Sequence, residues 1–512
     1  MKLNNTPIYV RENYSYKINN DGICEELSSL TTNEIKLLLD SRVCDRFNCD
    51  NELKFKFVGV ITLPYNIIVS LPKPYIDHSS CIISDIIKVL KDYKNSDQLK
   101  RNKKTSVNEN TTGELYLNNN LNDCSVNEIS ISDYIISDFI NYGLYQNFYS
   151  ELRLDGNGDT DWQHTVENID PLISNGYPIY TSTYNSEVFL DKNNKITELH
   201  KWAIDYSIQK YGQFLDYDIN TIYNEYDSYE NIGSYNELLY LIQTELNNTF
   251  ESRKINLLKA LNNLLNKSFG SVNGDSISLY GTSKFDTIWE YILQIVFKDE
   301  YYDKTFAEKY NRDIFKPIWQ DIKENTWQAH PIKPDIVRQV YNTLFIFDAK
   351  YYDIQFNYNN EGKLQVCGQP DSYDVIKQTY YKTKLEEEFS KFNKKGISEY
   401  INCFIYPQSN PKQYNYLKYD SDKAFDESFI ILGTVSIGDP IINIYVNPNY
   451  LFYRFKLNSP LSDEEMNKLK TKIIIEASKL KYKYTYNDNY IKKSPNRKFI
   501  NFYSKSRYRK KR

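Results

Sequence analysis

The residues best suited to chemistry are two aspartates and a lysine in one short segment. Asp335 follows a proline, twelve residues separate it from Asp348, and Lys350 stands two positions after Asp348. Two converging carboxylates can hold Mg²⁺, which prefers oxygen ligands and keeps several of its waters. A metal-bound water can attack phosphorus, while an adjacent ammonium orients or deprotonates that water or stabilises the negative transition state. These residue types at this spacing therefore indicate metal-dependent hydrolysis of a phosphate ester.

A strand–turn–strand segment has to bring these three side chains together. The runs 336–340 and 344–352 are strand-like, and the chain must reverse between them. One turn position places Asp335 opposite Lys350, and a turn one residue earlier places Asp335 opposite Asp348. Either register keeps the three side chains within one pleat, because cross-strand neighbours are roughly 5 Å apart. The sequence alone leaves the choice between the two registers open.

The residues around Asp348-Ala349-Lys350 distinguish this acid-x-Lys triplet from triplets that occur by chance. Burying Asp348 and Lys350 beside Phe347 without a partner costs several kcal/mol, so a functional site is the economical interpretation. The backbone carbonyl of Ala349 lies between the two charged residues and is a further predicted metal ligand. The alternative is an ordinary buried Asp–Lys ion pair inside a sheet. Other acid-x-Lys triplets occur at Glu34/Lys36, Glu52/Lys54, Asp92/Lys94, Asp321/Lys323 and Glu361/Lys363. None of them follows a Pro-Asp pair at hairpin distance.

A predicted helix over 283–299 supplies a fourth candidate, Glu290. The helix has one apolar face, and Asp286 and Glu290 lie four residues apart on its flank. Like charges at this spacing are unfavourable unless a cation lies nearby. A bound metal would satisfy both carboxylates. The alternative is that both are simply solvated.

The rest of the chain divides by composition into regions around this centre. With 512 residues it is too long for one hydrophobic core. The predicted regions are an α+β domain at 1–95, a polar linker or insertion at 96–125, a mostly helical middle region at 126–270, a catalytic domain at 271–460, and a C-terminal helix with a basic tail at 461–512. Within them we expect a hairpin from 54–62 and 65–71, helices at 81–93, 129–149, 193–213, 235–267, 373–386 and 462–480, and strands at 429–437 and 441–447.

Composition narrows the class of protein. The net charge of −4 gives no global attraction to nucleic acid, so any such binding uses local patches. The tail, 481–512, holds twelve Lys or Arg among aromatic residues, which is typical of a nucleic-acid contact or of a solvated tail. The seven cysteines form no CxxC pair, and no apolar run is long enough to span a membrane. We expect a cytoplasmic protein with reduced thiols.

Six segments of the sequence carry a resemblance to known nucleases: one motif and five further segments. The motif Pro334-Asp335 with Asp348-Ala-Lys350 resembles the PD-(D/E)xK nuclease signature. The flanking segments resemble LlaJI-type restriction endonucleases and McrC-like subunits; they are 280–290 (YGTSKFDTIWE), 374–381 (DVIKQTYY), 57–61 (FVGVI), 71–73 (LPK) and 158–162 (GDTDW). The resemblance implies that Glu290 is a metal ligand or positions water. It also implies that Lys377, Gln378 and Tyr381 face the DNA backbone.

The resemblance further implies an α/β fold with a mixed central sheet flanked by helices, and a subunit of a phage-defence restriction system. Such a protein cleaves double-stranded DNA with Mg²⁺, for which Mn²⁺ substitutes, and leaves a 5′-phosphate. Family members work with a McrB-like AAA+ GTPase and a cognate DNA methyltransferase. This chain has no GxxxxGK[ST] loop, so the nucleotide-hydrolysing motor is expected on a separate partner. Cutting both strands suggests a homodimer at the cleavage step. The alternatives are a repair or recombination nuclease and a DNA-binding subunit that no longer cuts.

Overall fold

The computed structural model of the chain describes most of its length, as two compact units. The described residues are 7–17, 27–47, 52–75, 83–96, 115–116, 127–270 except 216, 218–222 and 224, then 277–301, 315–320, 322, 326–328, 332–359, 361–391, 396–409, 422–437 and 439–480. Unit 1 combines Met1–Tyr116 with Gly281–Arg512, and unit 2 is Leu117–Tyr280. The predicted basic tail, 481–512, and nearly all of the predicted linker lie outside the described residues.

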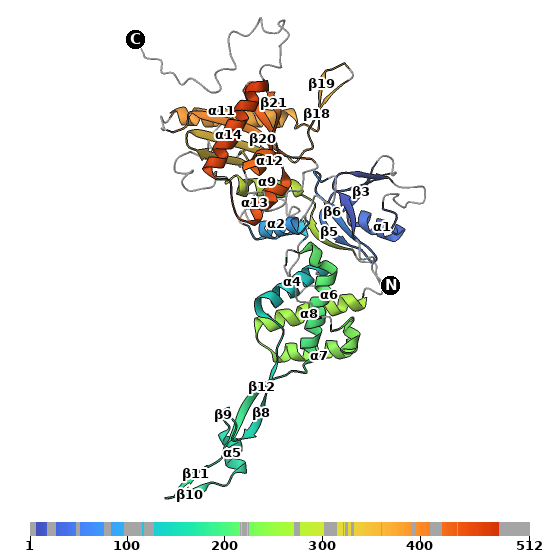
Figure 1. Cartoon of the computed structure of the whole chain (residues 1–512), viewed down its shortest axis with the longest axis vertical. Coiled ribbons are helices and arrows are strands. Elements are labelled where there is room, and N and C mark those ends of the chain that lie inside the picture. The colour runs from blue at the N-terminus through green and yellow to red at the C-terminus, as the bar shows by residue number, and fades with distance from the viewer. Residues whose placement is uncertain are drawn as a thin grey trace. The chain divides into compact units, whose positions relative to one another are not determined.

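A five-stranded mixed sheet organises the C-terminal part of unit 1 (Figure 1). Its strand order is β16-β17-β20-β22-β21; the two outer pairs are antiparallel and the inner pairs are parallel. The strands are β16 (Ile336–Val340), β17 (Thr343–Ala349), β20 (Glu399–Pro407), β21 (Phe429–Ser436) and β22 (Pro440–Val446). Their centres are apolar and buried, as expected for strands covered by helices on both faces. The predicted mixed sheet is confirmed.

Helices cover the two faces of this sheet because side chains along β17 alternate between the faces. Leu344 and Ile346 pack with Tyr381 and Leu385 of α11. On the opposite face Phe347 meets Phe297, with ring centroids 5.0 Å apart. The helices of this part are α9 (Phe285–Val296), α11 (Ser372–Lys391), α12 (Asp422–Ser428), α13 (Pro448–Lys456) and α14 (Asp463–Leu480). Two small ribbons complete it, β14 (Ile318–Gln320) with β15 (Thr326–Gln328) and β18 (Gln355–Tyr358) with β19 (Leu364–Cys367).

The N-terminal part of unit 1 is a second α/β region. One sheet has the order β1-β6-β5-β13-β7 and another the order β2-β4-β3. Their strands are β1 (Ile8–Arg11), β2 (Ser15–Lys17), β3 (Cys44–Phe47), β4 (Glu52–Phe55), β5 (Val58–Thr62), β6 (Ile67–Leu71), β7 (Leu115–Tyr116) and β13 (Ser278–Thr282). The helices are α1 (Thr32–Asp40) and α2 (Ile83–Asn95). The predicted hairpin is present as β5–β6; the first residues assigned to it, Lys54 and Phe55, instead belong to β4 in the other sheet.

Unit 2 consists of a helical bundle and an arm of strands. The bundle helices are α4 (Glu128–Tyr142), α6 (Lys195–Tyr211), α7 (Tyr235–Asn248) and α8 (Ser252–Gly270), with short 3-10 helices at Gly212–Phe214 and Tyr229–Asn231. Their apolar faces form one continuous core that includes Trp202 and Leu261. The predicted helix over 235–267 is two helices, which meet around Thr249.

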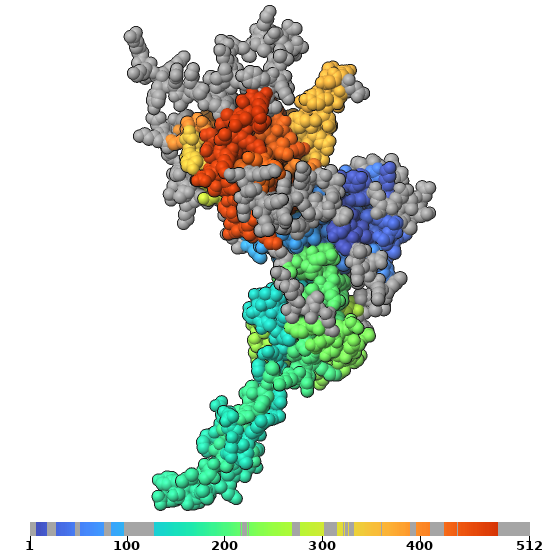
Figure 2. Space-filling model, viewed as in Figure 1, coloured from blue at the N-terminus to red at the C-terminus, as the bar shows by residue number. Residues whose placement is uncertain are grey.

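The arm, defined here as residues 148–190, was not predicted. It contains β8 (Phe148–Leu154), β9 (Asp159–Thr160), α5 (Trp162–Asn168), β10 (Leu172–Ser174), β11 (Tyr177–Ile179) and β12 (Tyr184–Leu190). It is a narrow projection of unit 2, drawn in teal (Figure 2). Gly158 is required at its turn, because a Cβ there would lie 1.9 Å from the Ser186 carbonyl oxygen. The predicted helix over 129–149 ends early, and Phe148 begins the first arm strand.

Candidate active site

The β16–β17 hairpin fixes the register that the sequence left open. Val340 pairs with Thr343, so the turn is Tyr341-Asn342, and Tyr341 adopts a positive φ of 51°. Ile336 pairs with Phe347, which places Asp335 at the next position opposite Asp348. One oxygen of Asp335 accepts a hydrogen bond from the Ala349 backbone N–H at 2.8 Å. The carboxylate of Asp335 is therefore held at the end of β17, beside Asp348.

Lys350 lies between two carboxylates. Its Nζ is 2.6 Å from Asp348 and 2.7 Å from Asp374, the latter in the first turn of α11. Asp348 is only 2% exposed and Lys350 only 8%. Charged side chains are rarely this buried without a partner or a role. The buried Asp–Lys pair considered as the alternative is present, but Asp335 stands beside it.

The three acids of this centre repel one another. Burial raises the pKa of Asp335 well above its ordinary value, and the charges of Glu290 and Asp348 raise it further. Burial also raises the pKa of Asp348, which Lys350 partly offsets. For Glu290, burial raises the pKa, Lys333 opposes the shift and Asp348 adds to it. A centre that disfavours its own negative charge in this way is suited to a cation.

Glu290 is tied to the hairpin through a neighbour on its own helix. Gln294 donates one hydrogen bond to the Glu290 carboxylate at 2.8 Å and another to the Asp335 carbonyl at 3.1 Å. The predicted helix is present as α9, and it brings Glu290 to the centre. Asp286, the other half of the predicted like-charge pair, is exposed.

The donor set can be tested against a divalent ion. Among the described residues no three His, Cys, Asp or Glu side chains already stand together as a ligand cluster. The acids near this strand end are nevertheless hard oxygen donors: Asp335 lies opposite Asp348, Glu290 interacts electrostatically with both, and Ala349 follows Asp348 on β17. One buried oxygen of Asp348 makes no hydrogen bond within the described chain, its close contact being the Lys350 charge. Oxygen donors of this kind fit Mg²⁺ or Mn²⁺ and do not fit a soft metal.

Comparison with known proteins identifies the family. The sequence model of the LlaJI restriction endonuclease family matches residues 57–447. The chain belongs to the LlaJI restriction endonuclease family. A relative in Bacillus subtilis (strain 168), the type II restriction enzyme BsuMI component YdjA, is 28% identical over 435 residues, which cover 82% of this chain and 85% of the relative. This LlaJI-family chain is thus a restriction endonuclease component, and the predicted family is confirmed.

Two solved structures are similar at low sequence identity. A chain from the refined half-complex of Thermococcus gammatolerans McrB AAA+ hexamers with bound McrC has 11% identity and a TM-score of 0.33, covering 88% of this chain and 99% of that chain. A chain of the Thermococcus gammatolerans McrBC complex has 11% identity and a TM-score of 0.23, covering 52% of this chain and 85% of that chain.

No helix among the described residues of this LlaJI-family chain is long and apolar enough to cross a bilayer.

The three predicted DNA contacts on α11 fall in different environments. Gln378 and Tyr381 are fully buried. Gln378 donates hydrogen bonds to the Ile346 carbonyl and to Asn402, and Tyr381 packs on Phe315. Neither side chain has a surface for DNA, so their predicted DNA contact is corrected to a packing role that holds α11 on the sheet. Lys377 is half-buried, and its charge lowers the pKa of Glu290, Asp335 and Asp348 against the effect of burial.

Two groups near the centre were not predicted as site residues. Asp374 belongs to a quoted family segment, yet its contact with Lys350 depends on how α11 packs and has no local signal. Tyr351, next to Lys350, donates a 2.6 Å hydrogen bond to Glu12 and accepts one from the Lys73 backbone N–H at 2.9 Å. These bonds fix the strand end that carries Lys350 to the N-terminal part of unit 1.

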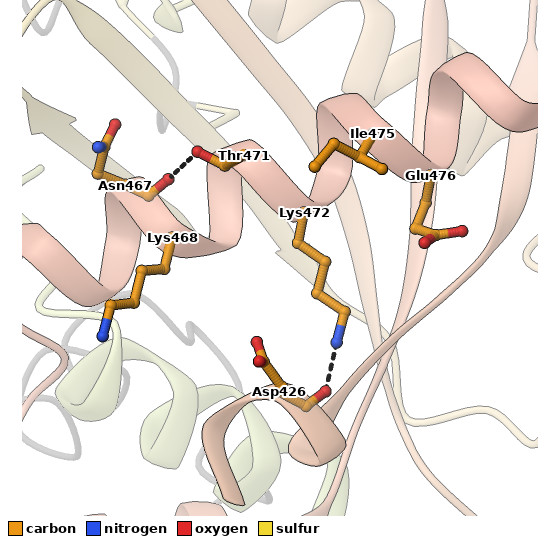
Figure 3. A pocket seen from close by; sticks show the side chains of 7 residues that line it. All are labelled: Asp426, Asn467, Lys468, Thr471, Lys472, Ile475 and Glu476. Atoms are coloured by element: carbon orange, nitrogen blue, oxygen red, sulfur yellow. Dashed lines mark hydrogen bonds between the residues drawn. The ribbon is translucent and has the colours of Figure 1, made fainter. Parts of the chain in front are cut away.

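A cavity of about 560 Å³ lies elsewhere in unit 1, between α12 and α14 (Figure 3). Lys472 points across it and donates a hydrogen bond to the Asp426 backbone carbonyl. The cavity is lined by Asp426, Asn467, Lys468, Thr471, Lys472, Ile475 and Glu476. Its lining mixes both signs of charge and includes none of the catalytic candidates. It is separate from the active centre.

Proposed function

We propose that this chain is the nuclease component of a restriction system and hydrolyses phosphodiester bonds of double-stranded DNA at the β16–β17 strand end. One observation carries the proposal: Asp335 and Asp348 meet at the end of a buried hairpin, with the Lys350 ammonium 2.6 Å from Asp348. This arrangement occurs in a chain of the LlaJI restriction endonuclease family. We further assign a PD-(D/E)xK nuclease domain, predicted at 271–460, to the part of unit 1 built on the mixed sheet; α14 (Asp463–Leu480), beyond the predicted end, packs on the same sheet.

Mg²⁺ is the proposed cofactor, with Mn²⁺ as a substitute. Asp335, Asp348, the Ala349 carbonyl and Glu290 would hold it, and when bound it supplies Lewis-acid activation of water and neutralises charge on the phosphate. The oxygen-only donor set and the mutual repulsion of the acids support this choice. Soft metals would require Cys or His ligands, which the centre does not offer among its described residues.

Lys350 acts in this proposal as a cation and not as a base. Burial opposes its charge, but Asp348 and Asp374 together raise the pKa of Lys350 above its ordinary value. A lysine that stays protonated at neutral pH donates hydrogen bonds and stabilises negative charge developing on the phosphate. Of the roles considered from the sequence, transition-state stabilisation is therefore preferred to deprotonation of water.

Lys377 is the proposed contact to the DNA backbone. It lies on α11 one turn beyond Asp374, and its charge acts on all three acids of the centre. Its ammonium is 5.6 Å from the Tyr381 ring centroid. Phosphate contacts of this kind fix the register of the duplex without reading its sequence.

The arm of unit 2 is the proposed surface for a protein partner. Apolar side chains at its end are largely exposed; Ile173 is 70% and Tyr177 73% accessible. Exposed apolar patches of this density mark protein interaction sites. The BsuMI relative is named as a component of its enzyme, and this chain lacks a nucleotide-binding loop. We propose a McrB-like AAA+ GTPase as the partner, a cognate DNA methyltransferase in the same system, and a homodimer at the cleavage step.

The decisive experiment is a plasmid-cleavage assay with the full chain. Purified protein is incubated with plasmid and Mg²⁺, with and without GTP and the product of the neighbouring gene. Asp348→Ala should lower the cleavage rate by on the order of 100-fold or more, because a proposed metal ligand is lost. Replacing Mg²⁺ with EDTA should abolish cutting in the native chain.

The matched control uses an exposed acid–Lys pair outside the centre and outside the β18–β19 ribbon. Glu476 and Lys479 of α14 form such an ion pair at 2.6 Å. Glu476→Ala should leave the rate within about two-fold, since exposed pairs contribute little. Equal cleavage by native and Asp348→Ala protein would refute the proposal, as would cutting in EDTA.

A further inference from the structure

We propose that the β18–β19 ribbon reads DNA bases through a face of exposed carboxamides, and so contributes sequence specificity. The inference rests on the proposed function, because it requires DNA to lie across the β16–β17 centre. The ribbon begins five residues after Lys350. The readers it assigns are Gln355, Asn357 and Gln365.

The pairing register sorts the ribbon into two chemically different faces. Phe356 pairs with Val366, and both pack on an apolar cluster of unit 1. The alternate positions on the other face are Gln355 opposite Cys367 and Asn357 opposite Gln365. All four of these side chains are exposed. The ribbon therefore packs on the domain through Phe356 and Val366, and presents amides on its other face. Nearer the tip, Tyr358 and Leu364 of the apolar face are exposed.

Both ends of the ribbon are held in place, so the amide face is preorganised. At the tip, the Asn359 side chain accepts hydrogen bonds from the Glu361 and Lys363 backbone N–H groups at 3.0 and 2.8 Å. At the base, Tyr445 donates a hydrogen bond to the Ile354 carbonyl. Gly368 has a φ of +67°, and a Cβ there would lie 2.2 Å from the Asp353 carbonyl oxygen. A rigid reader loses less entropy on binding than a loop does.

Carboxamides are the side chains that recognise adenine. Asn or Gln can donate to N7 and accept from the N6 amine of an adenine in the major groove, which admits a two-stranded ribbon. Gln355 already donates to Asp353 at 3.2 Å, which orients it on this face. In the described part of the chain, no hydrogen bond engages the side chains of Asn357 and Gln365. Directly paired, they present donors and acceptors to one region of a groove.

The charge of the ribbon favours base edges over phosphates. Its charged residues near the tip, Glu361 and Lys363, neutralise each other in an ion pair. A ribbon that bound the backbone would need excess cations, whereas base readout needs neutral donors and acceptors. Cations near the centre, such as Lys377, can contact the phosphates. The ribbon is then not needed for phosphate contact and can read bases.

The reach of the chain sets where the reading occurs. Asn357 is seven residues from Lys350, so their Cα atoms are at most about 25 Å apart. Base pairs rise by about 3.4 Å, which confines the contacted bases to within about seven pairs of the cut. Gln365 lies across from Asn357 and shares this limit.

The first test measures base preference in the cleavage products. The full chain, with its restriction partner and Mg²⁺, cuts a plasmid pool that carries a randomised segment, and the ends are sequenced. A Gln355→Ala, Asn357→Ala, Gln365→Ala triple variant should lose about ten-fold or more of the preference at each contacted pair, while cutting the pool. Gln243→Ala, Asn247→Ala, Asn248→Ala, which removes three exposed amides of α7, should keep the native preference.

The second test needs no hydrolysis, because a native thiol stands on the amide face. Cys367 is an exposed free cysteine opposite Gln355. A duplex whose adenine N6 linker ends in a mixed disulfide should react with the full chain in EDTA: the Cys367 thiolate attacks the linker disulfide, a protein–DNA disulfide forms, and the activating thiol leaves. The Cys367→Ser variant should lose that crosslink, and other cysteines of the chain serve as internal controls.

The outcomes separate this inference from the proposed function. Absence of a Cys367 crosslink, with native base preference in the triple variant, overturns the reader while cleavage still supports the nuclease. A triple variant that keeps its preference but no longer binds the protein partner also overturns it, and assigns the ribbon to subunit docking. No cleavage by the native chain under any condition refutes the nuclease alone, and the crosslink still decides the fate of the ribbon.

Discussion

The β16–β17 hairpin buries charge, whereas the arm of unit 2 exposes apolar surface. Asp348 and Lys350 lie deep in a sheet of phenylalanines and isoleucines, and every residue of β8 and β10 is exposed. Each region reverses the usual partition of polar and apolar groups, and each pays for this with stability. A buried charge needs a counter-ion within the fold, and an exposed apolar strand needs a partner outside it. Buried charge therefore indicates a chemical centre, whereas exposed apolar surface indicates a docking surface.

The largest expected effect comes from neutralising the centre. Asp335→Asn should lower cleavage by on the order of 100-fold or more, because a proposed metal ligand is lost. Without divalent ions the same variant should be more stable by about 1 kcal/mol, since burial and the charges of Glu290 and Asp348 disfavour the Asp335 carboxylate. Urea unfolding in EDTA measures the second effect. A variant that loses stability and still cuts would contradict the comparison.

A buried charge whose counter-ion the fold supplies should behave differently. Arg338 is 1% exposed and donates to the Phe297 and Leu461 carbonyls and to Asp463. Arg338→Met should cost about 2–4 kcal/mol of unfolding free energy, because it leaves the Phe297 and Leu461 carbonyls without their donor, whereas the exposed Asp463 stays solvated. The exposed Arg46, replaced by Met, should change stability by under about 0.5 kcal/mol. Equal losses in the two variants would show that Arg338 is not a structural anchor.

The arm should lose binding without losing stability. Ile173→Ser with Tyr177→Ser should weaken association with the partner by about 10- to 100-fold, since apolar residues at an interface dominate its energy. Unfolding should change by under about 0.5 kcal/mol, because both side chains are already solvated. Size-exclusion chromatography with the partner measures the first quantity. The same double change at the exposed Tyr240 and Phe250 of the bundle is the control.

Local sequence patterns predicted the strands and the helix of the proposed active centre. They did not predict the hairpin register or the contact between Asp374 and Lys350. Strand alternation around Asp348 and helix spacing around Glu290 depend on near neighbours, and both elements are present. The register depended on which residue takes a positive φ in the turn, and Tyr341 gave no signal of that. Asp374 reaches Lys350 only because α11 packs against β17, a contact between residues 24 positions apart.

Two misassignments have specific physical causes. β8 pairs with β12 over sequence separations that run from 30 positions (Leu154 with Tyr184) to 42 positions (Phe148 with Leu190), so no local period reveals the arm. On α11 the buried residues Gln378, Tyr381 and Leu385 recur at helical spacing, which marks the side facing the sheet. That spacing was visible in the sequence. The helical spacing indicates that Gln378 and Tyr381 pack against the sheet, and that Lys377 lies next to this buried face.

The smallest expected effect concerns His200, a buried neutral side chain in unit 2. A buried polar side chain with few hydrogen bonds is not necessarily part of a functional site. His200 is fully buried; its Nδ1 accepts the Tyr145 backbone N–H at 3.0 Å. Burial, with a contribution from Arg253, lowers the pKa of His200 to about 3. The unfolded chain, with a pKa of about 6.5, binds more protons between these values, so unit 2 should lose stability as pH falls below about 6.5.

The size and the control of this effect follow from the same linkage. The loss should reach about 2 kcal/mol at pH 5, measured as hydrogen exchange of α6 amides corrected for intrinsic pH dependence. His200→Asn keeps an acceptor for Tyr145 and should flatten the profile by that amount. His164→Asn, at a half-buried histidine of the arm, should leave it unchanged. An unaltered profile in His200→Asn would mean that His200 is protonated in the folded chain, and a buried cation there would then require a partner as the active centre does.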